Sequence, residues 1–203
     1  MDACALLLLF ALAGAAAGFS GAPFRNAPPA ASESAPPPST DLSDAEVAAR
    51  VRTYLAAIDT PIGAEKWRTL GPRAASPLEA VVNDPSELPS RRAKAVFALA
   101  LVGGARAETL VREVARSESE PLAVRASALE GAGLLLGPGE LVKALRPILE
   151  RSREATVRAL AAGVLSRRAK TRACGAIRAQ AKREPEDERA LFEAALARCA
   201  PSP

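Results

Sequence analysis

The sequence predicts an all-α fold, a right-handed α-α superhelical solenoid of about five helix pairs, from three observations. The first is a period of 33 residues, at which Gly and an Arg-Ala pair recur: Gly71, Gly104 and Gly137, and Arg92, Arg125 and Arg158. The second is apolar spacing typical of helices, without the alternation of strands. The third is composition: 49% of the residues are apolar but only 3% are aromatic, which favours helices packed through Ala, Leu and Val.

The N-terminal residues predict an export segment followed by a spacer. Residues 3–19 form an apolar run, and Ala15-Ala16-Ala17 offers a cleavage site, so residues 1–19 are interpreted as a signal peptide. No Lys or Arg precedes the run, and the alternatives are a membrane anchor retained at residues 3–19 and a cytosolic chain. Residues 20–41 are rich in Pro, Ala and Ser, which predicts a disordered linker. We therefore expect an exported protein, periplasmic or extracellular.

Residues 42–70 predict two N-terminal capping helices. Ser43 and Glu46 have the spacing of a capping box, and apolar residues then recur on one helical face: Val47, Val51, Leu55 and Ile58. Thr60-Pro61 ends this helix, and a shorter helix from about residue 62 to 70 carries Trp67. We expect Trp67 and Tyr54 to pack within the cap rather than stack on a ligand.

Residues 71–169 predict three repeats, each with two helices joined by a polar turn. The expected helices are 72–83 with 89–102, 105–116 with a helix opened by Pro121 and ended by Gly137-Pro138, and 141–151 with 155–168. No such pair buries its apolar stripe alone, so neighbouring pairs must stack. Gly131 and Gly133 inside a helix indicate close approach of another helix.

Residues 170–203 predict a C-terminal capping helix pair, whose second helix is opened by Pro185. Cys174 lies near the start of the first helix and Cys199 at the end of the second, and these ends are neighbours in an antiparallel pair. A disulfide between Cys174 and Cys199 is therefore expected. The alternative is two independent small core residues.

Several segments resemble the short bacterial HEAT repeat of the PBS-lyase type, which is similar to repeats in bilin lyases. The segments that carry the resemblance are Leu70-Gly71-Pro72, Pro77-Leu78, Val81-Val82, Arg92-Ala93, Glu120-Pro121, Val124-Arg125-Ala126 and Thr156-Val157-Arg158-Ala159. It covers roughly residues 62–199. The resemblance implies that the second helices line the concave side, where the candidate contact residues are Arg91, Lys94 and Glu130.

The same resemblance implies an acidic partner for the repeated Arg in the neighbouring unit. Such repeats usually carry an Asp before the second helix. The residues at that place here are Asp84 in the first repeat, Ser119 or Glu120 in the second, and Ser152 or Glu154 in the third. We interpret the repeated arginines as side chains that hold the stack together, and a row of anion-binding donors is the alternative.

The chain contains no His, which excludes a His-ligated metal, a Ser-His-Asp triad and a Cys-His pair within it. No spacing suggests a carboxylate dyad, an EF-hand loop or a phosphate-binding loop. The sequence therefore predicts no catalytic residue, no metal and no cofactor.

A basic segment near the C-terminus has no acidic residue between Ala155 and Arg183. Its candidate partner-binding residues are Arg167, Arg168, Lys170 and Arg172, and Arg178, Lys182 and Arg183 continue it. One interpretation is that this segment attracts a polyanion or an acidic partner. The alternative is a face that contacts only solvent. Without interleaved aromatic residues, nucleic-acid binding is not expected.

Three functional hypotheses follow. The first is a monomeric, non-enzymatic scaffold that binds a protein partner in the cell envelope. The second is electrostatic binding of an anionic surface or polymer through the basic edge. The third is an enzyme accessory of the bilin-lyase type.

Overall fold

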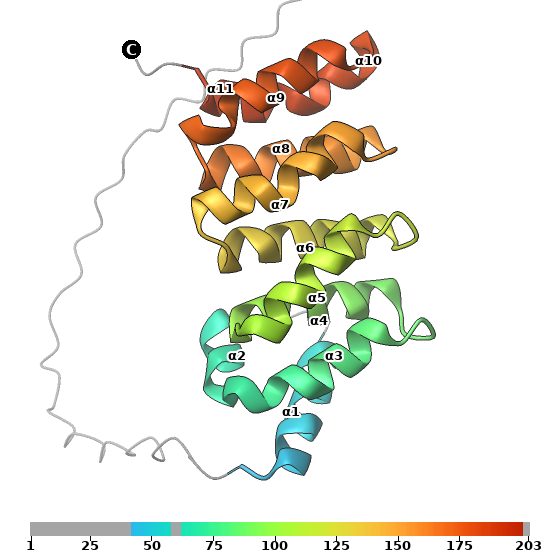
Figure 1. Cartoon of the computed structure of the whole chain (residues 1–203). Helices are drawn as coiled ribbons and strands as arrows, with labels where there is room; N and C mark the ends of the chain where they lie inside the picture. The colour runs from blue at the N-terminus through green and yellow to red at the C-terminus, as the bar shows by residue number, and fades with distance from the viewer. Residues whose placement is uncertain (1–41, 58–61, 201–203) are drawn as a thin grey trace, which may run out of the picture. The chain divides into compact units, whose positions relative to one another are not determined.

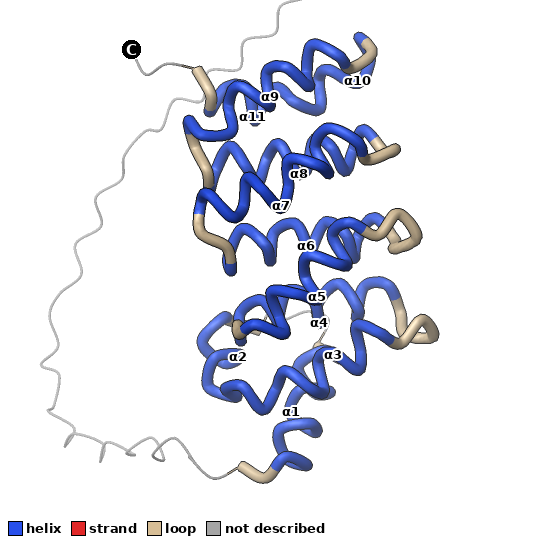
Figure 2. The backbone as a smooth tube through the Cα atoms, in the orientation of Figure 1, coloured by secondary structure: helices blue, strands red, loops and turns tan. Residues whose placement is uncertain are grey.

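The computed structural model describes residues 42–57 and 62–200, and its regular elements there are all helices (Figure 1). Figure 2 shows these helices joined by short loops, with no strand in the described ranges. The all-α part of the prediction is therefore confirmed. None of the described helices is long and apolar enough to cross a membrane. The predicted signal peptide or anchor (1–19), the linker (20–41), Ile58 and Thr60-Pro61 lie outside the described residues.

Two helices precede the repeats, α1 (Asp44–Ala56) and α2 (Ala64–Leu70). The Ser43 hydroxyl accepts a hydrogen bond from the Glu46 backbone N–H, and the Glu46 carboxylate accepts one from the Ser43 N–H, which closes the predicted capping box. Trp67 is buried, and its ring meets that of Tyr54 edge-on, with the centroids 5.2 Å apart. The two aromatic residues thus pack against each other, as expected.

The central part of the chain consists of a short 3-10 helix and six α-helices. They are η1 (Gly71–Ala74), α3 (Ala75–Asn83), α4 (Pro89–Val102), α5 (Ala105–Arg116), α6 (Leu122–Leu135), α7 (Pro138–Arg151) and α8 (Ala155–Arg168). Helices α3, α5 and α7 pack on α4, α6 and α8, respectively. Helix α6 lies between α4 and α8 and contacts both, so the second helices of the pairs form one layer (Figure 1).

Gly137 and Pro138 begin a helix, whereas the sequence predicted that they end one. Helix α6 already ends at Leu135, and Gly137 is the N-cap of α7 with φ −63°. A glycine that ends a helix commonly has a positive φ, as Gly103 does at the end of α4 with φ 81°. Pro138 occupies the first turn, where its missing N–H leaves no helical hydrogen bond unmade. The start of this helix therefore moves from residue 141 to Pro138.

The last pair begins with α9 (Thr171–Arg183), but its second member is not the single helix that was predicted. Pro185 is the N-cap of α10 (Glu186–Arg189), which is followed by η2 (Ala190–Phe192) and α11 (Glu193–Arg198). The sulfurs of Cys174 and Cys199 lie 2.01 Å apart and their Cα atoms 5.3 Å apart, which confirms the predicted disulfide. This bond joins α9 to the end of α11.

The two glycines inside α6 lie where that helix touches its neighbours. A Cβ on Gly131 would stand 2.9 Å from the Cβ of Ala100 in α4. A Cβ on Gly133 would stand 2.8 Å from Cγ1 of Val164 in α8. Both distances are shorter than a carbon–carbon contact allows, so glycine lets α6 approach helices on both sides.

Candidate functional site

The repeated arginines lie between successive helix pairs rather than on an open surface. The side chain of Arg92 is largely buried. Its Nε donates to the carbonyl oxygen of Val82 (2.8 Å), at the end of the preceding helix. Its Nη2 pairs with Glu120 (2.8 Å), in the turn of the next helix pair. One side chain therefore connects two pairs.

Arg125 is in the same position one repeat later, and its side chain is fully buried. Its Nη1 pairs with Glu154 (3.2 Å), and its Nη2 contacts both Glu118 (2.9 Å) and the Ser152 hydroxyl (3.0 Å). Burial raises the pKa of the Glu118 carboxyl, but hydrogen bonds from Ser152 and Arg125 outweigh burial and lower this pKa overall. The cluster thus favours the charged form of Glu118 beside a buried guanidinium.

Arg158 repeats the arrangement at the last helix pair. Its Nε donates to Glu184 (2.7 Å), its Nη2 also pairs with Glu188 (3.1 Å), and its Nη1 donates to the carbonyl oxygen of Ser152 (2.8 Å). The hydrogen bond from Arg158 lowers the pKa of the Glu184 carboxyl. Each repeated Arg thus reaches an acidic side chain of the next pair.

These acidic partners are glutamates, found 28, 29 and 26 residues after their arginines. Glu120 and Glu154 were among the residues expected at this place, but sequence reasoning missed Glu184. Asp84 accepts hydrogen bonds from the Ser86 N–H (2.9 Å) and hydroxyl (2.6 Å) within its own turn, so it does not take the expected role. The first two intervals, applied to Arg158, point to Glu186 or Asp187, so the spacing in the sequence did not identify Glu184.

One surface of the second helices remains accessible, and we call it the second-helix face. It contains exposed or half-buried residues at helical spacing on α4, α6 and α8: Lys94, Phe97 and Leu101, then Ser127, Glu130 and Leu134, then Leu160, Gly163 and Arg167. Phe97 is 39% exposed and Leu134 is 40% exposed, although both are large and apolar. The face therefore presents apolar side chains from adjacent helices to the solvent.

The charged residues of this face already have partners. Glu130 pairs with Arg167, which links α6 to α8 across the face. The Lys94 ammonium donates to the carbonyl oxygen of Ala57, just after α1 (2.6 Å). Three of the predicted partner-binding residues thus lie on the second-helix face, where Glu130 and Arg167 neutralise each other and the Lys94 ammonium keeps its charge.

The other predicted partner-binding residues lie elsewhere. Arg91 pairs with Glu87 one turn before it (2.8 Å). Lys170 is the N-cap of α9, with φ 49°. Arg168 and Arg172 lie over the backbone at Gly133 and Gly139, respectively. The basic residues of the segment therefore come from α8, the turn after it and α9.

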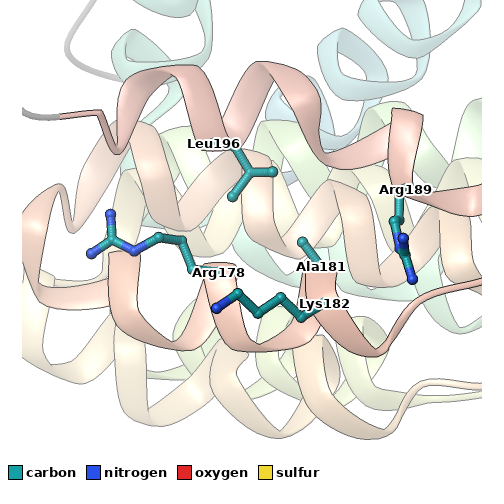
Figure 3. Close-up of a pocket in the computed structure, with 5 residues that line it drawn as sticks. All are labelled: Arg178, Ala181, Lys182, Arg189 and Leu196. Carbon is teal, nitrogen blue, oxygen red and sulfur yellow. The ribbon is translucent and has the colours of Figure 1, made fainter. Parts of the chain in front are cut away.

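A groove of about 480 Å³ runs between α9 and the α10–α11 segment, and we call it the end groove. Its lining residues are Arg178, Ala181, Lys182, Arg189 and Leu196 (Figure 3). In Figure 3 the apolar side chains of Leu196 and Ala181 lie between the two segments, and the basic side chains surround them. The sequence placed Arg178 and Lys182 in the basic segment but did not indicate a groove.

Within the described ranges, no group of three or more Cys, Asp or Glu side chains is arranged to hold a metal ion. Comparisons of the chain with protein-family models, with curated proteins and with solved structures find no match.

Proposed function

We propose that the chain is an exported, non-enzymatic HEAT-like solenoid that acts as a scaffold and binds a protein partner through the second-helix face. The observation that carries this proposal is the exposure of Phe97 and Leu134 on a face where Glu130 and Arg167 neutralise each other. Exposed apolar side chains on adjacent helices are typical of protein-binding surfaces. Aromatic residues such as Phe are enriched in protein interfaces.

The proposed solenoid is supported by a recurrence of burial at the sequence period. Ala95, Ala128 and Ala161 are spaced by 33 residues, and each is fully buried in the layer of second helices. At the same period, Arg92, Arg125 and Arg158 each form an ion pair with a glutamate of the next helix pair. We propose a right-handed superhelix with the second helices on its concave side, as the resemblance to HEAT-like repeats implies.

Export is supported by the disulfide between Cys174 and Cys199. Disulfides persist in oxidising compartments such as the periplasm and the extracellular space. The proposed scaffold would therefore meet its partner in the cell envelope or outside the cell.

The test is site-specific photo-crosslinking of the full chain in its native host. A benzophenone amino acid replaces Phe97 in one variant and, as the control, Leu88 in another. Leu88 is 60% exposed and is the N-cap of α4, outside the residues that define the second-helix face. We expect Phe97 to crosslink one discrete protein that Leu88 does not crosslink, and Leu134→Glu to remove this product. Identical products from both positions, or a product that survives Leu134→Glu, would refute the proposal.

The second candidate is binding of an anionic polymer or surface through Arg167, Arg168, Lys170 and Arg172. It is favoured by the absence of acidic residues between Ala155 and Arg183. It predicts binding that falls steeply with added salt and is lost when Arg167, Arg168 and Arg172 are changed to Glu. Because Arg167 itself lies on the second-helix face, crosslinking from Phe97 that is insensitive to Arg168→Glu combined with Arg172→Glu would separate the two candidates.

A further inference from the structure

The end groove combines three cationic side chains with an apolar floor. Arg178 and Lys182 come from α9, one helical turn apart, and Arg189 comes from the end of α10. Leu196 of α11 and Ala181 of α9 lie between them (Figure 3). The groove therefore offers positive charge on its sides and a hydrophobic contact at its base.

The three cations of the groove keep unused donors. Arg178 uses Nη1 on the carbonyl oxygen of Cys199 (2.9 Å), and Arg189 uses Nε on the carbonyl oxygen of Glu184 (3.0 Å). These contacts hold both guanidinium groups in place but neutralise neither. The nearby carboxylates of Glu184 and Glu188 pair with Arg158 instead, on the side toward α8. The positive charge of the groove is thus left uncompensated in the described part of the chain.

We infer that the end groove binds a short acidic segment of a protein, with carboxylates on Arg178, Lys182 and Arg189 and an apolar side chain on Leu196. Guanidinium and ammonium groups form charge-assisted hydrogen bonds with carboxylates. An extended segment that alternates acidic and apolar residues would satisfy both parts of the groove. This inference concerns a surface separate from the second-helix face and does not depend on the function proposed for that face.

The charge around the groove favours a short segment over a polyanion or an anionic membrane. Between Thr171 and Cys199 the chain has six basic and five acidic residues, so this helix pair is close to neutral. The acidic residues include Glu186 and Asp187, which are exposed on α10. An extended anionic surface would meet them as well, whereas a short segment reaches only the cations that line the groove.

The experiment measures binding of a defined probe to the full chain by fluorescence anisotropy. The probe is a labelled hexapeptide of alternating Glu and Leu, acetylated and amidated at its ends, and the comparison peptide has Gln in place of Glu. We expect the Glu peptide to bind with a dissociation constant near or below about 0.1 mM at about 0.15 M salt, and the Gln peptide to bind at least about tenfold more weakly. Equal affinity for both peptides, or no binding of the Glu peptide, would overturn the inference.

A matched pair of variants tests whether the groove itself is the site. Lys182 lines the groove, whereas Arg183 is the next residue of α9, is exposed and does not line it. Lys182→Glu and Arg183→Glu change the net charge equally. We expect Lys182→Glu to weaken binding about tenfold or more, and Arg183→Glu to weaken it less than about twofold. Equal losses of affinity would mean that the net charge of the protein attracts the peptide, which contradicts a defined site.

Sedimentation with vesicles of phosphatidylglycerol tests the alternative ligand of the groove, a lipid headgroup, with the same two variants. The inference predicts that sedimentation with the vesicles does not distinguish Lys182→Glu from Arg183→Glu. If Lys182→Glu alone abolished vesicle binding while the Glu peptide failed to bind, the groove would recognise a lipid headgroup, and the inference of a protein segment would be wrong.

Discussion

Replacing Gly131 by Ala is expected to destabilise the chain relative to the same replacement at Gly175. Both glycines lie inside helices, α6 and α9, so both substitutions gain the helix propensity of Ala. They differ in surroundings. A Cβ at position 131 would stand 2.9 Å from the Cβ of Ala100, whereas a Cβ at position 175 would meet nothing within 4 Å.

The magnitude follows from these distances. Non-bonded carbon atoms prefer separations of about 3.5–4.0 Å. Since Ala100 has no rotamer with which to move away, Gly131→Ala must shift α4 and α6 apart by roughly half an ångström or more. Overpacking of this kind costs about 1–3 kcal/mol, and the propensity gain offsets about 1 kcal/mol of it. Gly175→Ala has the gain in helix propensity without the cost of overpacking. The two variants should therefore differ in the free energy of unfolding by about 1–3 kcal/mol.

Urea unfolding followed by far-UV circular dichroism measures this difference. The expected result is a lower urea midpoint for Gly131→Ala than for Gly175→Ala, with similar slopes for both transitions. Equal midpoints would show that the spacing of α4 and α6 adjusts freely to a methyl group. The account of α6 as a helix held close to its neighbours through glycine would then be refuted.

Three further predictions concern the contacts between helix pairs. Arg125→Met should lower the free energy of unfolding by about 2–4 kcal/mol, since it removes the buried partner of several polar groups, and an unchanged urea midpoint would contradict the bridging role of Arg125. Reduction of the Cys174–Cys199 disulfide should cost about 3 kcal/mol, measured by urea unfolding with and without reductant. Because Arg158 lowers the folded pKa of Glu184 below its ordinary value of 4.5, this stabilisation is present above that value and is lost as the pH falls through the folded pKa. Glu184→Gln should therefore flatten the acid limb of the stability curve, and an equally steep limb in both proteins would contradict the assignment.

Local signals were sufficient for several elements. The capping box of Ser43 and Glu46 marked the start of α1, because both members act within one helical turn. Gly137-Pro138 was misread, since the same dipeptide suits the end of one helix and the start of the next when the loop between them is short. The breaks in the second member of the last pair were also not predicted.

The sequence by itself determined the all-α fold, because helical periodicity is a local property. It favoured the pairing of Cys174 with Cys199 over two independent cysteines, because the ends of an antiparallel helix pair are neighbours. The 33-residue period also identified Arg92, Arg125 and Arg158 as equivalent residues. Only the tertiary structure decided which charges are neutralised: Arg167 is paired with Glu130, while Lys182 lines a groove without an acidic partner among residues 42–57 and 62–200. The physical reason is that Coulomb interactions depend on distances between side chains far apart in the chain. A repeat period states which residues are equivalent, but not which acidic side chain each basic one will reach.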